Sequence, residues 1–266
     1  MTARQEAGPD VNTHAPGVPP VQSVARAFGL LEVIADSGGA TNLSDLARSA
    51  GLPLGTIHRL LRTLVDLGYL RQQPSREYAL GPRLIRLGET SSHLVGPWAR
   101  PYLGALVDEL GETANLAMLD GDQIVYVAQV PSRHSMRMFT EVGKRVSPHC
   151  TAVGKAMLSS LPGAQVDAIL RTSGLHRYTD NTITDPVSLA EQLEVVRDRG
   201  YATDEGEKET GVRCVAVPVL GAPARMAMSI SGPAPRMTDA LVERAVPVLL
   251  SSAQALAADL TGLPGR

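Results

Sequence analysis

The spacing of hydrophobic residues near the N-terminus predicts three short helices. Over residues 22–36 they recur at intervals of three and four, which predicts an apolar helical face formed by Val24, Ala27, Phe28, Leu31 and Ile34. The same spacing predicts helices at residues 43–50 and 54–67, the second with a core-facing stripe of Ile57, Leu60, Leu61 and Leu64. Gly51 and Gly68 follow directly after these two segments and end them.

Two short runs with strand character follow the third predicted helix. Residues 69–71 and 76–80 predict two strands, and the turn around Pro74 joins them as a hairpin. Three short helices followed by a hairpin are the plan of a winged helix-turn-helix. Pro82 then suits the first position of a further helix, which we expect over residues 83–95 as a connector.

The rest of the chain mixes strands with helices. The pattern predicts strands at residues 115–119, 123–130, 135–140, 200–204, 212–219 and 224–231, the first two as a hairpin around Asp120-Gly121. It predicts helices at residues 98–110, 152–161, 164–172, 186–199 and 238–260. This order favours an α+β domain built on an antiparallel sheet.

Composition suits a globular protein and gives weak support for nucleic-acid binding. Of the 266 residues 44% are hydrophobic, and the formal net charge is −2. Residues 21–96 contain eight Arg, no Lys and six acidic residues, a net charge of +2 on a chain that is otherwise acidic. A mildly basic N-terminal part is compatible with DNA binding. The two cysteines, Cys150 and Cys214, have neither disulfide-framework nor zinc-finger spacing, which favours a cytoplasmic protein with reduced thiols.

The N-terminal residues have the composition of a disordered leader. Residues 1–20 carry Pro, Gly and Thr without an apolar stretch, which disfavours a signal peptide. No run in the chain approaches the roughly 20 apolar residues of a membrane span, so we expect no membrane partner.

Residues 43–61 have the features of a helix-turn-helix. Small Ala47 lets two helices approach, Gly51 allows the tight turn, and Leu52 fills the corner. With the apolar stripe facing the core, the opposite face of the second helix presents Gly55, Thr56, His58, Arg59 and Arg62, with His58 at its edge. Such a strip can enter a major groove, where arginine pairs with phosphates or bidentately with guanine.

Periodicity alone leaves a second interpretation of this strip open. Three-helix units with exposed arginines are common, and exposed arginines are usually only solvated. The ordered succession of a small residue, a glycine turn and a polar outer face favours DNA binding.

Residues 150–160 predict a helix whose N-terminus can bind an anion. Thr151 can cap this helix, and the first backbone N–H groups of a helix have no partner within it. Ala152 and Val153 have little side chain to keep a carboxylate away from these N–H groups.

Other chemical sites are disfavoured by their spacing. Gly154-Lys155-Ala156 resembles part of a phosphate-binding loop, but His149 holds the place of the first glycine and Lys155 lacks a following Ser or Thr. The six histidines include no pair at metal-ligand spacing, so we expect no metal and no cofactor. Adjacent His149 and Cys150 are an improbable nucleophile pair, because sequence neighbours rarely have that geometry. The acidic run around Lys208, which consists of Glu205, Glu207 and Glu209, indicates a solvated loop.

Motifs along the chain resemble the IclR (isocitrate lyase regulator) family of transcription regulators. In the N-terminal part the resemblance rests on residues 54–64, 68–70 and 78–81. In the C-terminal part it rests on segments that follow in the same order, residues 115–119, 142–143, 148–156, 200–205, 211–219 and 229–233. The resemblance covers roughly residues 21–262. It implies a GAF-like effector domain with a mixed, mainly antiparallel sheet, a homodimer or dimer of dimers, and a palindromic operator.

This resemblance assigns a role to each part of the chain. It implies a disordered leader at residues 1–20, a winged helix-turn-helix DNA-binding domain at 21–82, a linker helix at 83–96 and a GAF-like effector-binding domain at 97–262. Most members of the family are repressors and some are activators.

The resemblance also implies an effector pocket. It places Ala152 and Val153 there through their main-chain N–H groups, in a stretch where the family more often has Ser-Gly-Ala-Gly-Lys. The bulk of Val153 is expected to narrow the pocket or to change the preferred effector. Opposite this helix the resemblance places polar residues and an apolar wall, namely Asp204, Cys214, Ser229 and Ser231, with Met138, Val146 and Val212.

The residues themselves allow two interpretations of this polar group. Ser229 and Ser231 are two positions apart on a predicted strand, so they face the same side, and two hydroxyls suit a polar ligand. Alternatively Asp204 is a loop or cap residue, Cys214 fills a small core position, and the serines are ordinary strand residues.

The implied effector is a small carboxylate. Residues 112–117 and 136–138 resemble the allantoin-pathway repressors of the family, which makes glyoxylate and allantoate the leading candidates and leaves aromatic acids open. The rival classes are an enzyme that turns over a small carboxylate and a structural adaptor. The sequence contains neither a nucleophile elbow nor paired catalytic acids, so it does not support an enzyme.

Overall fold

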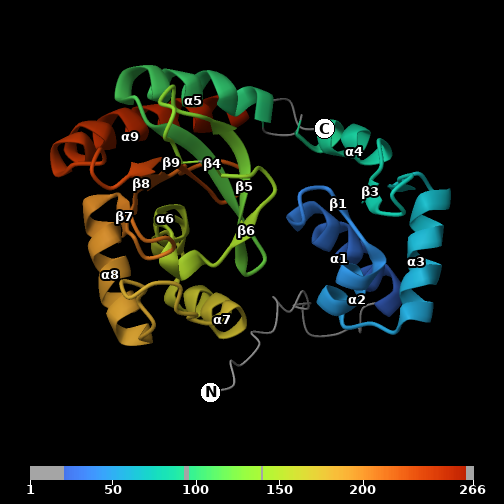
Figure 1. Ribbon diagram of the computed structural model, residues 1–266. Helices are drawn as coiled ribbons and strands as arrows, with labels where there is room; N and C mark the ends of the chain where they lie inside the picture. Colours follow the sequence, from blue (N-terminus) through green and yellow to red (C-terminus); the bar gives the residue numbers. More distant parts are fainter. Residues whose placement is uncertain (1–20, 93–95, 139, 262–266) are drawn as a thin grey trace. The chain divides into compact units, whose positions relative to one another are not determined.

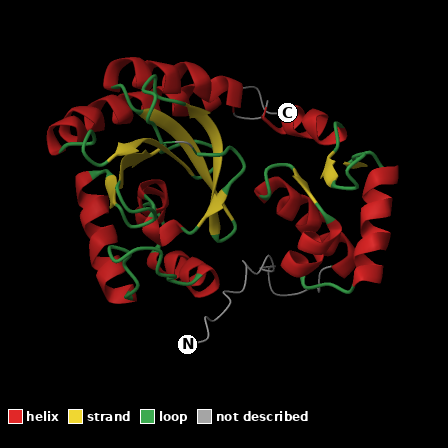
Figure 2. Ribbon diagram, in the orientation of Figure 1, coloured by secondary structure: helices red, strands yellow, loops and turns green. Residues whose placement is uncertain are grey.

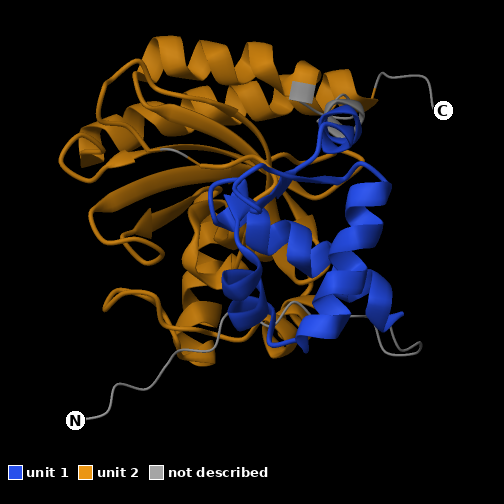
Figure 3. Cartoon of the chain, turned by 45° about the vertical axis from the view of Figure 1, so that its right-hand side comes forward, with its two compact units in different colours: residues 1–91 blue, residues 92–266 orange. Residues whose placement is uncertain are grey.

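Hydrophobic cores form separately in two parts of the chain, which divides into units of residues 1–91 and 92–266 (Figure 3). The computed structural model describes residues 21–92, 96–138 and 140–261. The boundary between the units falls within the predicted linker at residues 83–96, and the predicted leader at residues 1–20 lies outside the described residues.

The first unit has the helices and the hairpin of a winged helix-turn-helix (Figure 1). Its helices are α1 (Gln22–Asp36), α2 (Leu43–Ala50), α3 (Leu54–Asp66) and α4 (Arg83–Ser92). Its strands are β1 (Ala40–Thr41), β2 (Leu70–Gln72) and β3 (Tyr78–Leu80), paired antiparallel in the order β1-β3-β2. Strand β1 was not predicted, because two residues are too short to show a periodicity. Helix α4 was predicted to extend to residue 95, and residues 93–95 lie outside the described residues.

The core of the first unit confirms the predicted stripe of α3 and corrects that of α1. Ile57 and Leu61 are fully buried with Leu30, Ile34 and Leu46. The predicted apolar face of α1 is wrong at its N-terminal end, where Val24 and Phe28 are 53% and 60% exposed. The buried residues of α1 lie in its C-terminal half, so only that half is covered within this unit.

Two glycines fix the backbone of this unit. Gly51 follows α2 in the left-handed conformation, with φ of 59°, as the tight turn requires. At Gly81 a Cβ atom would lie 2.3 Å from the carbonyl oxygen of Gly68, so the chain passes too close to the backbone between α3 and β2 for any side chain. The hairpin and the end of α3 are therefore locked together by backbone contact.

The second unit is an antiparallel sheet with helices on both faces (Figure 2). Its helices are α5 (Gly96–Leu110), α6 (Ala152–Ser159), α7 (Gly163–Ser173), α8 (Pro186–Arg199) and α9 (Asp239–Thr261), with a 3-10 helix η1 (Pro148–Cys150). Its strands are β4 (Thr113–Asp120), β5 (Gln123–Val130), β6 (Arg145–Val146), β7 (Ala202–Glu205), β8 (Val212–Pro218) and β9 (Met226–Pro233). The sheet order is β6-β5-β4-β9-β8-β7, and every pairing among the described strands is antiparallel. The predicted α+β class is confirmed.

Each face of this sheet has its own hydrophobic cluster. Helices α5 and α9 cover one face through residues such as Leu103, Leu249 and Leu256. Helix α6 covers the other face, where the strands present small residues such as Ala117 and Ala216. Figure 1 shows α7 and α8 on the same side as α6. These small strand residues let α6 approach the sheet closely.

The described residues of the segment 135–140 do not form the predicted strand. In the described part of this segment two backbone carbonyl groups accept hydrogen bonds from side chains. Thr113 Oγ1 donates to the Met138 carbonyl and Arg236 Nη2 donates to the Met136 carbonyl, and each bond is 2.9 Å long. The segment is therefore a loop held by side chains, and the short strand β6 lies further along the chain.

Helix α9 is long and apolar enough to span a membrane, with 23 residues and a mean hydropathy of 1.2. Its buried residues, which include Val242 and Ala245, cover the sheet together with α5. The same composition is typical of the core helix of a globular domain.

Substituting Gly81 tests the backbone contact of the first unit. We expect Gly81→Ala to destabilise this unit by about 1–3 kcal/mol, because the new methyl group forces a shift of the chain around Gly68. Hydrogen exchange of the amides in residues 21–81 measures the change without interference from the second unit. Gly29→Ala in α1 is the control, because its added Cβ meets nothing within 4 Å and alanine favours a helix. Equal exchange rates in the two variants would contradict the role of Gly81.

Candidate functional site

A cavity lies on the α6 side of the sheet in the second unit. Its volume is about 40 Å³, and about 10–15 Å³ on the same measure holds one water, so the cavity suits a molecule of a few non-hydrogen atoms. The residues that line it come from the strands, from the start of α6 and from two loops, namely Asn115, Tyr126, Met138, Thr140, Thr151, Ala152, Val153, Asp204, Lys208, Glu209, Val212, Cys214, Ser229 and Ser231.

The register of the paired strands brings together the polar side chains that line one wall of the cavity. Asp204 pairs with Cys214, and Cys214 pairs with Ser231, so these three side chains form a row across neighbouring strands. Asn115 pairs with Ser229 in the adjacent row. Because alternate residues of a strand face opposite sides, the apolar residues between them enter the core under α5 and α9.

Asn115 orients both serines. Its Nδ2 atom donates to Ser231 Oγ over 3.2 Å and to Ser229 Oγ over 3.5 Å, while its Oδ1 atom accepts a 3.0 Å bond from Gln129 Nε2. Since each serine oxygen accepts from the amide, its own hydroxyl hydrogen is left to donate to another acceptor. The wall is therefore rich in donors. The role of Asn115 in the cavity could not be predicted from the sequence, because its position opposite Ser229 depends on the pairing of β4 with β9.

The start of α6 forms a second group of donors. Thr151 caps the helix as expected, with its Oγ1 atom accepting a 3.2 Å bond from the Gly154 N–H. A Cβ atom on Gly154 would lie 2.1 Å from the Pro148 carbonyl oxygen, so glycine is needed for α6 to start against η1. With the Gly154 N–H capped, helix geometry leaves the N–H groups of Ala152 and Val153 beside the cavity.

Asp204 is a buried carboxyl group of the cavity wall, only 3% exposed. Burial raises its pKa to about 7, an effect that the nearby Glu207 carboxylate strengthens and the 2.7 Å hydrogen bond from the Glu207 N–H opposes. A large share of Asp204 is therefore protonated at neutral pH. In that form it can donate a hydrogen bond to a ligand oxygen as well as accept one.

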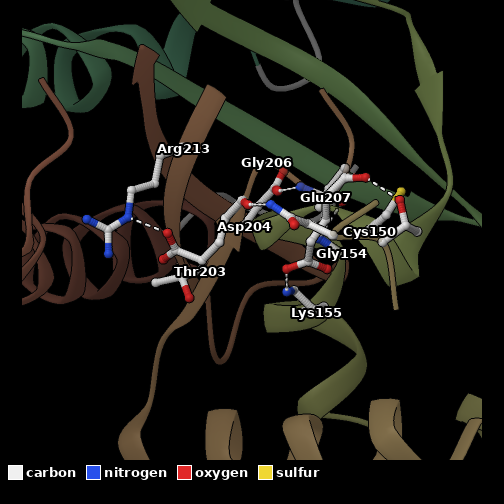
Figure 4. Close-up of polar contacts among 12 residues, drawn as sticks. Cys150, Gly154, Lys155, Thr203, Asp204, Gly206, Glu207 and Arg213 are labelled. Atoms are coloured by element: carbon white, nitrogen blue, oxygen red, sulfur yellow. Dashed lines mark hydrogen bonds and ion pairs between the residues drawn. The ribbon is translucent and has the colours of Figure 1, made fainter. Parts of the chain in front are cut away.

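Lys155 and Glu207 form a buried ion pair (Figure 4), and neither side chain belongs to the residues that line the cavity. Both side chains are almost completely inaccessible, and the carbonyl oxygen of Glu207 accepts a 2.6 Å hydrogen bond from Thr182 Oγ1. The prediction of a solvated acidic loop is thus wrong at Glu207. Lys155, which belongs to the partial phosphate-loop match, holds α6 to this loop and is not open to a ligand.

The two thiols remain protonated. Burial raises the pKa of Cys150 to about 12 and raises that of Cys214 well above its ordinary value. His149 bonds through Nε2 to the His176 carbonyl group over 3.0 Å. Neither thiol has the lowered pKa of a nucleophile. Across the described residues, no cluster of His, Cys, Asp and Glu could hold a metal ion.

The structure brings together all but one of the residues expected in the pocket. Those that line the cavity are Met138, Ala152, Val153, Asp204, Val212, Cys214, Ser229 and Ser231. Val146, the exception, is 7% exposed on β6 and packs in the hydrophobic cluster of this face with Ile124. Val146 and Arg145 are neighbours on β6, so their side chains point to opposite sides and that of Val146 enters the core. Five lining residues were missed by sequence reasoning, namely Asn115, Tyr126, Thr140, Lys208 and Glu209, and a sixth, Thr151, was expected only as the cap of α6.

Helix α3 presents the predicted polar strip in the first unit. Gly55, His58, Arg59 and Arg62 are exposed and Thr56 is half-buried, opposite the buried stripe. Within the described residues, neither arginine of the strip forms an ion pair. Such a face has charge available for phosphates or base edges.

Sequence comparison identifies relatives over nearly the whole chain. The profile described as "IclR helix-turn-helix domain" matches residues 23–74, and "Bacterial transcriptional regulator IclR C-terminal" matches residues 89–258. The "Transcriptional repressor IclR" of Escherichia coli K12 is 38% identical over 90% of this chain and 89% of its own length. The "HTH-type transcriptional repressor AllR" of Salmonella typhimurium LT2 is 31% identical over 82% of each chain. Identity therefore does not single out the allantoin branch.

Solved structures share the fold. An IclR-type regulator from Alicyclobacillus acidocaldarius has a TM-score of 0.80 and 31% identity, covering 90% of this chain and 99% of its own. A homologue from Microbacterium hydrocarbonoxydans complexed with 4-hydroxybenzoate has a TM-score of 0.76 and 24% identity, covering 91% of this chain and 100% of its own.

The raised pKa of Asp204 predicts how the stability of the second unit depends on pH. The folded state keeps a proton that the unfolded chain loses above about pH 4, so stability falls as pH rises from about 4 to 7, by up to about 1.4 kcal/mol per pH unit. Asp204→Asn keeps the acceptor for the Glu207 N–H and cannot ionise, so this variant should lose less stability than the wild type. Urea unfolding at about pH 5 and about pH 8, followed by the fluorescence of Trp98, measures the difference.

Asp185→Asn is the matched control. The pKa of Asp185 is lowered by hydrogen bonds from Ser188, so it stays ionised across this range and its loss should leave the pH dependence unchanged. A wild-type pH dependence in Asp204→Asn would show that Asp204 is ionised throughout.

Proposed function

The chain belongs to the IclR family of bacterial transcriptional regulators, and we propose that it is a repressor that a small carboxylate releases from a palindromic operator. The observation that carries this proposal is the donor-rich cavity of the second unit, where α6 N–H groups and two serine hydroxyls surround a space for a small acid. The function requires a DNA-binding face, a dimer and a ligand that favours one of two states.

In this proposal the DNA-binding face is the exposed strip of α3, formed by Gly55, Thr56, His58, Arg59 and Arg62. Its arginines contact phosphates and guanine edges, while Thr56 and His58 contact phosphates or neighbouring bases. In a dimer the two α3 helices would enter successive major grooves, about 34 Å apart. A palindromic operator matches the two-fold symmetry of such a dimer.

Exposed apolar side chains in the first unit support self-association. Val24 and Phe28 on α1, with Ile85 and Leu87 on α4, are between 45% and 63% exposed. Large apolar side chains exposed on a helix are commonly covered by a partner, and a two-fold dimer is the most frequent arrangement. We propose a homodimer or a dimer of dimers.

The size and chemistry of the cavity favour a short carboxylate as effector. The N–H groups of Ala152 and Val153 suit the carboxylate, and Ser229, Ser231 and protonated Asp204 suit its carbonyl or hydroxyl oxygen. A volume of about 40 Å³ fits glyoxylate or pyruvate better than allantoate with its two ureido groups. Glyoxylate is therefore the leading candidate. Met138 and Val212 form the apolar part of the wall.

The target pathway follows from the effector. If glyoxylate is the effector, the regulated genes would serve the catabolism of allantoin and glyoxylate, through which the nitrogen of purines is recovered. The alternative is a repressor or activator of another carboxylic or aromatic acid pathway, which the 4-hydroxybenzoate complex of the Microbacterium homologue makes worth testing. In either case a ligand that binds the DNA-incompetent state more tightly shifts the population off the operator.

A cytoplasmic regulator accounts for the site better than an enzyme does. The thiols have raised pKa values, and the lysine of α6 is engaged in a buried ion pair. Turnover of a bound carboxylate would instead support an enzyme. A protein that shows no sequence-specific DNA affinity and no response to a ligand would be a structural adaptor.

Arg59→Ala tests the recognition face. We expect operator affinity to fall about tenfold or more and the salt dependence of binding to weaken, because a guanine or phosphate contact is lost. A gel shift on the upstream intergenic DNA of this protein's own gene, at several salt concentrations, measures both. Arg100→Ala on α5 is the control, because Arg100 is exposed in the other unit. Unchanged affinity and salt dependence in Arg59→Ala would show that the recognition face has been wrongly assigned.

Two cavity variants test the effector site. Asp204→Ala and Cys214→Ser should need about tenfold more glyoxylate than the wild type to release the operator, because each removes a contact with the bound acid. Both should keep wild-type operator affinity, since they lie outside the first unit. Gel shifts titrated with glyoxylate, pyruvate and allantoate measure the effect, and wild-type release in both variants would exclude this cavity as the effector site.

A further inference from the structure

One cationic side chain lines the cavity and has no role in the function proposed so far. Among the lining residues that the structure describes, only Lys208 carries a positive charge. Burial keeps a large share of Asp204 protonated at neutral pH, and Glu209 is exposed and makes no ion pair with Lys208. Lys208 is therefore the one cation among these lining residues that an anion in the cavity can meet.

An aromatic ring holds the ammonium group of Lys208. Its Nζ atom lies 3.1 Å from the centre of the Tyr178 ring, whose hydroxyl is bonded to Ser147 Oγ over 2.8 Å. Within the described chain no carboxylate lies within 4.0 Å of this ammonium. An ammonium has three donors and a ring face occupies one side of it, so hydrogen-bonding capacity remains for an anion.

The backbone of Lys208 is fixed by its neighbour Glu207. The Glu207 N–H donates to Asp204 and its carbonyl oxygen accepts from Thr182, while its side chain pairs with buried Lys155. Glu207 is thus anchored through its N–H, its carbonyl and its side chain. Lys208 is therefore presented from a rigid loop, which reduces the entropy lost when a ligand binds.

The ammonium lies on the side of the cavity where α6 begins. Ser147, which bonds the Tyr178 hydroxyl, directly precedes η1, and η1 leads into the Thr151 cap of α6. The charge is close enough to oppose the effect of burial on the thiol of Cys150, the residue before that cap. A cation and a helix N-terminus therefore face the same part of the cavity, and both favour an anion.

We propose that Lys208 selects the charge of the effector by pairing with the carboxylate that the first N–H groups of α6 also bind. This inference rests on the proposed function, because it assumes that the cavity takes a small acid. It assigns Lys208 the task of rejecting neutral molecules of the same shape. The other donors of the wall, Ser229 and Ser231, do not distinguish a carboxylate from an amide oxygen.

The test compares charged and neutral probes on the full-length protein. Isothermal titration calorimetry is run with glyoxylate and pyruvate, and with pyruvamide as the neutral analogue of pyruvate. In the wild type we expect both acids to bind and pyruvamide to bind at least about tenfold more weakly than pyruvate. In Lys208→Gln the affinity for both acids should fall about 10- to 100-fold and the preference over pyruvamide should disappear.

Two further variants separate charge from folding. Lys208→Arg keeps the cation and should retain affinity within a few-fold, whereas Lys144→Gln removes an exposed lysine that does not line the cavity and should have no effect. Urea unfolding followed by the fluorescence of Trp98, which belongs to the second unit, shows whether each variant is folded. Loss of acid affinity in Lys208→Gln with rescue by Lys208→Arg supports the proposal.

The two ways of failing are distinguishable. If the wild type binds an acid and Lys208→Gln binds it equally well, the role of Lys208 is overturned and the proposed function stands. If the wild type binds neither acid, the carboxylate effector itself is overturned and the role of Lys208 with it. Equal affinity of the wild type for pyruvate and pyruvamide would also overturn charge selection.

Discussion

The cavity depends on the buried ion pair between Lys155 and Glu207. Removing two charges from water is costly, and the pair is stable only when each charge keeps its partner inside the protein. Lys155 therefore fixes the distance between α6 and the loop after β7. Asp204 bonds the Glu207 N–H and Lys208 follows Glu207, so both the carboxyl and the cation of the cavity take their positions from this pair.

The sheet supplies the rest of the site by dividing its two faces. One face is apolar and packs against α5 and α9, where large side chains such as Leu116 and Ile230 make the core. The other face has alanines where α6 packs and polar residues where it does not. The cavity occupies this second region. The strand positions that build the core thus alternate with those that build the site, and stability and ligand chemistry are set by different residues on the same strands.

The electrostatics of the cavity suit an anion although the protein as a whole is slightly acidic. Lys155 and Glu207 neutralise each other, and burial keeps much of Asp204 protonated. What remains is the ammonium of Lys208, the solvent-exposed carboxylate of Glu209 and the donors at the start of α6. A local balance of this kind is invisible in the net charge of −2. The charge of one cavity in the second unit and of one helix face in the first is therefore set locally and not by the net charge of the chain.

Local sequence patterns determined most of the secondary structure and the polar face of α3. Helix α3 followed from the spacing of Ile57 and Leu61, and the turn before it from Gly51, because helical periodicity and positive φ are properties of short segments. The apolar face expected for α1 failed at Val24 and Phe28, since exposure depends on which other elements cover a helix. The residues of the segment 135–140 allow a strand, but side chains of Thr113 and Arg236 hold the described part of this segment as a loop.

The site itself shows the same division between local and tertiary information. The capping of α6 by Thr151 and the shared side of Ser229 and Ser231 could be predicted, because each involves residues within a few positions of one another. The burial of Glu207, the contribution of Asn115 and the position of Lys208 could not. Each of these depends on segments far apart in the sequence meeting through strand register or an ion pair, and the energy of a buried charge or amide is decided only by the partner it meets there.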